Sequence, residues 1–169
     1  TKSRSDTKNW IVYHSALGNT NTLSLNTSDI AGDDSSGMHA TPTATSLFLK
    51  SANSVNANNQ DYIAYLFATV AGISKVGSFQ GNGGDVTVDC GFTNGCKFIL
   101  YRDTGSSSHW RVFDSVRGIN SGADPAISLN LTSAELTTSD LVDPTSSGFT
   151  AISTTSNTYI FYAIAADHH

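Results

Sequence analysis

The sequence of 169 residues has few charged side chains, a single glutamate and only two cysteines. Glu135 is the only Glu, and Asp, Glu, Lys and Arg together make up 14% of the chain. Because Glu, Lys and Arg favour helices, their scarcity argues against a helical protein. Two cysteines cannot build a disulfide framework or a four-ligand zinc site. For Cys90 and Cys96 two interpretations stay open, which are a pair of small buried side chains and one disulfide.

Basic clusters and long hydrophobic runs are also missing. Nine Lys and Arg are scattered singly from Lys2 to Arg117, and the formal net charge is −5. Without a basic stripe to neutralise phosphates, we expect no nucleic-acid partner. The longest apolar stretch, residues 62–73, is interrupted by Thr69 and Gly72 and is shorter than the roughly 20 residues that span a bilayer. We therefore expect no membrane insertion.

Polar turn and strand residues dominate what is present. Ser, Thr and Asn supply 57 of the 169 residues, and 38% of the chain is hydrophobic. Recurring Tyr and Phe and the low net charge allow the chain to bury a core, which disordered sequences cannot do. This composition predicts an all-β protein with many short strands joined by polar turns.

An internal repeat gives the first clue to the architecture. Residues 9–18 align with residues 109–118 without a gap, and Trp, Val, an aromatic residue, Ser and Gly keep their places. Three more aligned blocks follow in the same order, namely 23–26 with 127–130, 42–48 with 144–149, and 62–68 with 159–165. Repeats of this kind decide the fold. We predict an antiparallel, jelly-roll-like β-sandwich built from two diverged copies.

The copies are expected to cover residues 1–69 and 70–167 and to pack together as one sandwich, while 168–169 resemble the stump of an expression tag. Strands are expected before Trp110 in the second copy, but no comparable strands are expected before Trp10. The first copy is therefore predicted to be incomplete. Either an upstream segment has been lost, or the second copy or a neighbouring chain supplies the missing strands. One or two helical turns are expected around 133–136.

The repeat also supplies candidate core residues. Strand alternation places Trp and Val of each copy on one face, and this face is the predicted core because its residues are kept while Ile11 is replaced by Arg111. Stacking of either Trp on a sugar is the alternative. The core markers are Trp10, Val12, Trp110 and Val112, together with Tyr62 and Tyr159 at the start of the two aromatic strands.

Several blocks resemble a repeat domain of tail-fibre and other tail-associated proteins from marine bacteriophages, especially those infecting cyanobacteria. The resemblance rests on residues 9–14, 62–65, 72–79 with 81–83, and the Gly-Phe element at 91–92. Those proteins usually have a proline after the Gly-Phe element, whereas here Thr-Asn-Gly-Cys stands there, and the cysteine pair becomes a local clamp of this turn.

This resemblance implies a subunit of a fibre on the virion surface, in an extracellular, homo-oligomeric assembly with other virion subunits. It implies adhesion to a host cell-surface glycan or protein and offers no catalytic residues to carry over. Independently of the resemblance, we expect no cofactor. A purely structural virion component, such as a fibre-building or capsid-decoration subunit, is the alternative.

An enzyme is the remaining hypothesis to weigh. Glycoside hydrolases usually need two carboxylates beside the scissile bond. Glu135 has no acidic neighbour in sequence, and Asp33 with Asp34 or Asp140 with Asp143 are the nearest substitutes. The sequence has no serine-nucleophile motif, Walker lysine or metal-ligand spacing. We therefore predict a protein that is not an enzyme and holds no metal.

Binding residues are expected on the loops that differ most between the copies. Amide and carboxylate groups suited to sugar hydroxyls cluster at Asn56, Asn58, Asn59, Gln60 and Asp61. The other candidates on variable loops are Asp33, Asp34, His39 and His109. For each loop the alternative is a solvated surface without a ligand, and for the adjacent Asp pair calcium binding is a further one.

Overall fold

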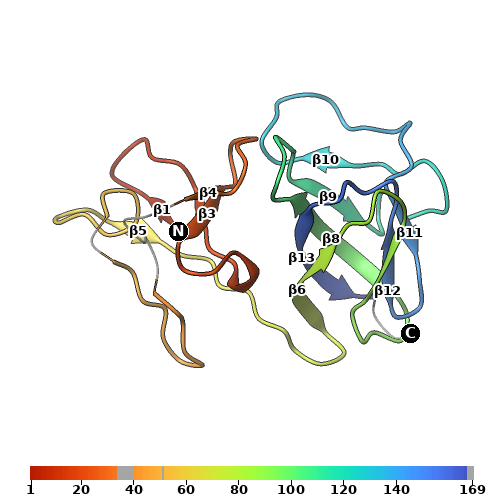
Figure 1. The fold of residues 1–169 in the computed structure, drawn as a ribbon, viewed down its shortest axis with the longest axis horizontal. Helices are drawn as coiled ribbons and strands as arrows, with labels where there is room; N and C mark the ends of the chain where they lie inside the picture. The colour runs from red at the N-terminus through yellow and green to blue at the C-terminus, as the bar shows by residue number, and fades with distance from the viewer. Residues whose placement is uncertain (34–39, 51, 167–169) are drawn as a thin grey trace. The chain divides into compact units, whose positions relative to one another are not determined.

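The computed structural model describes residues 1–33, 40–50 and 52–166. The chain divides into two compact units, Thr1–Leu66 and Phe67–His169, which are called unit 1 and unit 2 (Figure 1). The predicted division after residue 69 lies a few residues further along the chain.

The protein is all-β, as its composition predicts, and its strands pair antiparallel. In the described ranges there is no α-helix, and the one helical element is the 3-10 turn η1 (Ser15–Leu17). The prediction of a helix around 133–136 is wrong, because Leu136 instead exchanges two backbone hydrogen bonds of 2.9 Å with Ala126. No helix among the described residues is long and apolar enough to cross a membrane.

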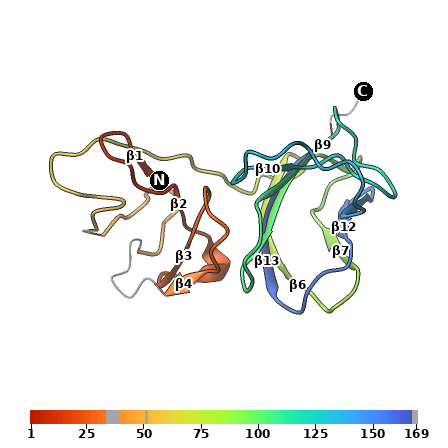
Figure 2. The same cartoon turned by 90° about the horizontal axis from the view of Figure 1, so that it is seen from above.

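Unit 2 is a β-sandwich of two antiparallel sheets, which Figure 2 shows as separate layers. The first sheet has the strand order β10 (Ile127–Ser128), β9 (Arg111–Asp114), β8 (Cys96–Asp103), β13 (Thr158–Ala165) and β6 (Ser74–Gln80). The second sheet has the order β11 (Val142–Pro144), β12 (Gly148–Ala151) and β7 (Val86–Asp89). The longest strands, β8 and β13, lie side by side in the middle of the first sheet.

Aromatic side chains join the two sheets of unit 2. Phe149 of the second sheet meets Phe161 edge to face at 5.5 Å between ring centroids, and Phe79 in the same manner at 6.2 Å. Phe113 and Ile99, which face each other across β8 and β9, are fully buried in the same cluster. Because cross-strand partners share a face, these contacts fix which side of the first sheet forms the core.

The Trp/Val face is not the face that packs between the two sheets, contrary to the prediction. Trp110 and Val112 are buried, yet from this strand it is Phe113, on the opposite face, that joins the cluster between the sheets. The ring of Trp110 lies under the guanidinium of Arg102, 5.3 Å from the ring centroid. In unit 1, Ile11 is buried while the other two residues of this pattern, Trp10 and Val12, are half-buried.

Unit 1 contains two small sheets. One pairs β1 (Lys2–Ser3) with β5 (Tyr62–Ile63), and the other has the order β2 (Ile11–Val12), β3 (Asn21–Ser24) and β4 (Gly32–Asp33). Ile11, Leu23 and Val55 are its buried apolar residues. A strand therefore does precede Trp10, contrary to the sequence-based expectation, although it is only two residues long.

The two units share a hairpin with the same register and the same side-chain latch. In β2–β3, Val12 faces Leu23, and at the aligned positions of β9–β10, Val112 faces Ile127. The side-chain oxygen of Asn26 accepts the backbone N–H of Trp10 at 2.9 Å. The side-chain oxygen of Asn130 accepts the N–H of Trp110 at 3.1 Å.

The strand pair β1–β5 of unit 1 is also equivalent in register to the strand pair β8–β13 of unit 2. The pairs in unit 1 are Lys2 with Ile63 and Ser3 with Tyr62, and the aligned pairs in unit 2 are Arg102 with Ile160 and Asp103 with Tyr159. Both Ser3 and Asp103 are buried and accept backbone N–H groups of the loop that follows. These are likenesses in strand pairing, and the duplication itself stays a prediction.

Candidate functional site

The predicted binding loop of unit 1 lies on the surface. Its residues Asn56, Asn58, Asn59, Gln60 and Asp61 are all exposed. The hydroxyl of Tyr62 holds the loop, since it donates to the carbonyl of Asn53 at 3.0 Å and accepts the N–H of Ala57 at 2.9 Å. The structure thus places five polar side chains together on a tethered loop.

The side chains of the three other candidate binding residues in unit 1 are not described. Asp33 ends β4, and its side chain is not described. Asp34 and His39 lie outside the described residues. The remaining candidate, His109, belongs to unit 2.

The carboxylates considered for catalysis have different surroundings. Glu135 forms an ion pair of 2.8 Å with Nε of Arg117, which also pairs with Asp114. Burial first, and then the neighbouring carboxylates Asp143, Asp124 and Asp85, raise the pKa of Asp140. Within the described ranges, no three His, Cys, Asp or Glu side chains gather in a way that could hold a metal ion.

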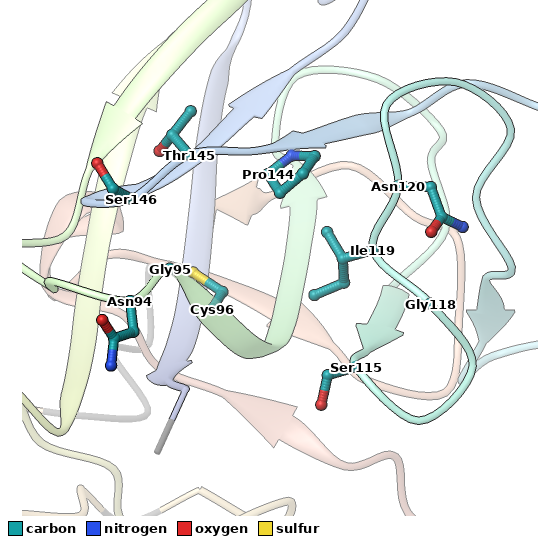
Figure 3. A pocket seen from close by; sticks show the side chains of 10 residues that line it. All are labelled: Asn94, Gly95, Cys96, Ser115, Gly118, Ile119, Asn120, Pro144, Thr145 and Ser146. Carbon is teal, nitrogen blue, oxygen red and sulfur yellow. The ribbon is translucent and has the colours of Figure 1, made fainter. Parts of the chain in front are cut away.

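Two depressions of unit 2 lie near opposite ends of β8. The larger one has a volume of about 520 Å³ and lies beside Cys96, where β8 begins. Figure 3 shows that its lining comes from three segments, 94–96, 115–120 and 144–146. This lining includes Asn, Ser and Thr side chains with Ile119 and Pro144, but no charged side chain.

Cys96 in this lining interacts with Cys90, and both are free thiols. The hydrogen bond with Cys90, together with burial, raises the pKa of the Cys96 thiol. The same hydrogen bond lowers the pKa of Cys90, against the opposing effect of burial. The single S–H of Cys96 can instead donate to the carbonyl of Gly148, at 3.4 Å. Of the two thiols, Cys90 therefore ionises first and can initiate disulfide formation.

We expect diamide to join Cys90 to Cys96 and to stabilise unit 2. The disulfide would close a short loop, which restricts the unfolded chain and stabilises the fold by about 2 kcal/mol. Mass spectrometry would show the loss of two hydrogens within one chain, and urea denaturation would show the gain in stability. Cys90→Ser is the control, because it leaves no partner for Cys96. Oxidation that yields only dimers joined between chains would contradict the expectation.

The smaller depression, of about 300 Å³, lies near the other end of β8. It is called the Arg111 pocket and is defined by Tyr101, Asp103, His109, Arg111, Ser153 and Tyr159, with the hydroxyls of 106–108 and 154–155 around them. Strands β8, β9 and β13 and three connecting segments, which include Leu141, contribute to it. It therefore brings together residues that are up to 58 positions apart in the sequence, from 101 to 159.

The carboxylate of Asp103 is fully used by hydrogen bonds. One oxygen accepts the N–H of Gly105 at 2.8 Å, and the other accepts from Ser106 at 2.7 Å, Thr155 at 2.8 Å and Asn157 at 3.1 Å. Burial acts to raise the pKa of Asp103, but these hydrogen bonds outweigh it and hold the pKa below its usual value. Asp103 is thus an ionised anchor of two loops and not a proton donor.

Arg111 and Tyr101 are direct cross-strand neighbours on β9 and β8. Arg111 donates through Nη1 to the hydroxyl of Ser128 at 2.5 Å, and none of the described carboxylates forms an ion pair with it. Burial lowers the pKa of Arg111, although an arginine stays charged in water. Burial raises the pKa of Tyr101, so its hydroxyl remains a protonated donor.

His109 adds a third donor. The side-chain oxygen of Asn130 accepts the N–H of Trp110, which orients the amide so that its nitrogen lies 3.1 Å from Nδ1 of His109. An amide nitrogen donates only, so Nδ1 of the neutral imidazole accepts and Nε2 carries the proton. A donor is thereby fixed on the far side of the ring.

Ser153, in the loop that forms one wall, has φ = 50°. Its N–H donates to the carboxylate of Asp85 at 2.9 Å. The left-handed conformation is strained for residues with a side chain, and such strain is common at ligand sites. The wall of the pocket is therefore held in a conformation that the chain would not adopt by itself.

Of the residues of this pocket, His109 is a predicted binding residue and Tyr159 a predicted core marker, whereas Arg111 and Tyr101 were not predicted as site residues. One signal was available. Arg111 stands where the first copy has Ile11, so a charged residue replaces a buried apolar one on a strand that is otherwise matched.

The sequence was compared with known families, curated proteins and solved structures. Residues 1–167 match the family model described as "Domain of unknown function (DUF7483)". The chain belongs to this family. No curated protein and no solved structure matches the chain. For this DUF7483 domain, function must therefore be inferred from the arrangement of its own residues.

Proposed function

We propose that this chain is a non-catalytic recognition module of a fibre on a virion surface, and that it binds a host cell-surface glycan. The observation that carries the binding role is the Arg111 pocket. A volume of about 300 Å³ is at the lower end of the range of small-ligand sites, and convergent polar groups with shifted pKa values are typical of functional sites. The virion context rests on the resemblance to phage tail-fibre repeats.

The chemistry of the pocket favours binding over hydrolysis. Asp103 is the one carboxylate in the described lining, and all of its hydrogen-bonding capacity toward protein donors is in use. Glycan hydrolysis usually requires a second carboxylate on the opposite side of the sugar. Hydroxyl, imidazole and guanidinium groups instead suit the hydroxyls of a sugar.

We expect the intact chain to retain glycans on an array of bacterial surface polysaccharides. His109→Ala should weaken that binding about fivefold, since it removes one hydrogen-bond donor from the pocket. The matched control is Asn58→Ala with Gln60→Ala, on the exposed loop of unit 1, which should bind like the unchanged protein. Loss of binding in this control would assign recognition to unit 1, and retention of no glycan would reject the adhesion proposal.

A structural role in a virion is the second candidate, and an exposed apolar segment favours it. Tyr65 and Leu66 are 62% and 72% exposed, although they align with Tyr162 and Ala163 of β13, which is paired on both sides by β6 and β8. Exposed apolar patches are common at subunit interfaces. A stable homo-oligomer that binds no glycan would favour this role.

A further inference from the structure

We propose that the Arg111 pocket recognises an oxyanion carried by a sugar, that is, a carboxylate or a sulfate ester of an acidic glycan. This inference rests on the proposed adhesion function and specifies its ligand. It follows from the balance between hydrogen-bond donors and acceptors in the pocket.

The donors in the pocket are largely unused. Arg111 makes one hydrogen bond, to Ser128, and its guanidinium has five N–H groups. The hydroxyl of Tyr101 makes no hydrogen bond to a described residue, and His109 has one partner, at Nδ1. A pocket with three kinds of free donor is suited to a ligand that supplies acceptors.

The carboxylate and one tyrosine hydroxyl of the pocket, by contrast, already accept hydrogen bonds. The carboxylate of Asp103 receives four hydrogen bonds, and the hydroxyl of Tyr159 receives the N–H of Thr155 at 3.0 Å. The negative charge of Asp103 is thus spread over polar donors of two loops. Beyond these two groups and Nδ1 of His109, the side-chain acceptors of the described lining are hydroxyls, which also donate, so a neutral sugar finds no free charged acceptor here.

The positive charge of Arg111 decides the class of ligand. It is partly buried and has no carboxylate partner among the described residues. A desolvated guanidinium without a counter-ion is unfavourable, and a planar fork of N–H groups pairs best with a carboxylate or sulfate. The chain as a whole is acidic, with a net charge of −5, so attraction of an anion would be local to this pocket.

The experiment measures binding of four probes to the full chain by isothermal titration calorimetry. The probes are tetragalacturonate, its methyl ester, a sulfated galactose tetramer and the unmodified galactose tetramer. We expect one or both anionic probes to bind and both neutral probes to bind at least about tenfold more weakly, because the charge-assisted hydrogen bonds are lost. Which anionic probe binds distinguishes a carboxylate from a sulfate ligand.

Variants assign the effect to the pocket. Arg111→Gln should lower the affinity for the anionic probe about tenfold or more. Arg111→Lys should retain part of the affinity, since lysine keeps the positive charge but lacks the planar fork of N–H donors. Tyr101→Phe, which removes one hydroxyl from a buried ring, should weaken binding several-fold without cavity formation. The matched control is Arg4→Gln, which makes the same change of net charge at an exposed position of unit 1.

The outcomes separate this inference from the function on which it rests. Equal binding of charged and neutral probes, or full binding by folded Arg111→Gln, would overturn the oxyanion proposal while adhesion stands. Binding of no probe here and of no glycan on the array would overturn both. The comparison of probes on the unchanged protein remains decisive if a variant fails to fold.

Discussion

Replacing Phe149 with alanine is expected to destabilise unit 2 by about 3–5 kcal/mol, which is the typical cost of removing a buried aromatic ring. Phe149 is fully buried, and it meets Phe161 and Phe79 edge to face. These contacts are the main aromatic link between the two sheets, so the cavity would open in the centre of the sandwich. A loss of this size is a large part of the stability of an ordinary small domain.

Urea denaturation followed by fluorescence would measure this loss, and hydrogen exchange would locate it in β12 and β7. Phe48→Ala is the control, because Phe48 is 46% exposed in unit 1 and its removal should change stability by less than about 1 kcal/mol. A similarly small effect of Phe149→Ala would mean that the two sheets do not share one core.

Asp103→Asn is the second change with a large expected effect, about 3 kcal/mol of lost stability. Hydrogen bonds to a buried charged group are stronger than neutral ones. An amide nitrogen in place of one oxygen would face the donors of Ser106, Thr155 and Asn157. Both loops beside the Arg111 pocket would lose their common anchor.

The same substitution should change the response to acid. Despite burial, hydrogen bonds hold the pKa of Asp103 below its usual value, so in acid the folded protein binds fewer protons here than the unfolded chain. Its contribution is complete above about pH 4 and is lost as the pH falls through the pKa of the folded state. Thermal unfolding between pH 2 and 7 should therefore show a weaker acid dependence in Asp103→Asn.

Asp89→Asn provides the control for charge, because Asp89 is exposed and accepts one hydrogen bond, from the N–H of Gly91. It should leave both the stability and its acid dependence nearly unchanged. If Asp103→Asn is as stable as the unchanged protein at neutral pH, the four hydrogen bonds do not hold the loops.

The strands of unit 2 could be predicted because their signals are local. The strands expected before Trp110 in the second copy correspond to β6, β7 and β8, and the aromatic strand expected at 159–165 corresponds to β13. Alternation of apolar residues and glycine turns between the strands was sufficient for this part of the fold. The same pattern at 62–68 gave only the two residues of β5, since β1 offers it a partner of only two residues.

Other features depended on contacts that a single sequence does not display. Each face of β9 carries a buried residue, Val112 on one and Phe113 on the other. The matching Trp and Val of the two copies therefore could not show that Phe113 is the residue that faces the second sheet. In place of the helix expected at 133–136, Leu136 forms an antiparallel backbone bridge with Ala126. The Arg111 pocket joins strands and loops that are distant in sequence, so composition of any one loop could not predict it.

The hydrogen bonds of Asp103 have a consequence for the kinetics of recognition. They connect the loop after β8 with the loop before β13, through Gly105 and Ser106 on one side and Thr155 and Asn157 on the other. The entropy of ordering these walls is thus lost when the chain folds and not when a ligand arrives. Association should then proceed in a single step, and affinity among related ligands should vary through their dissociation rates.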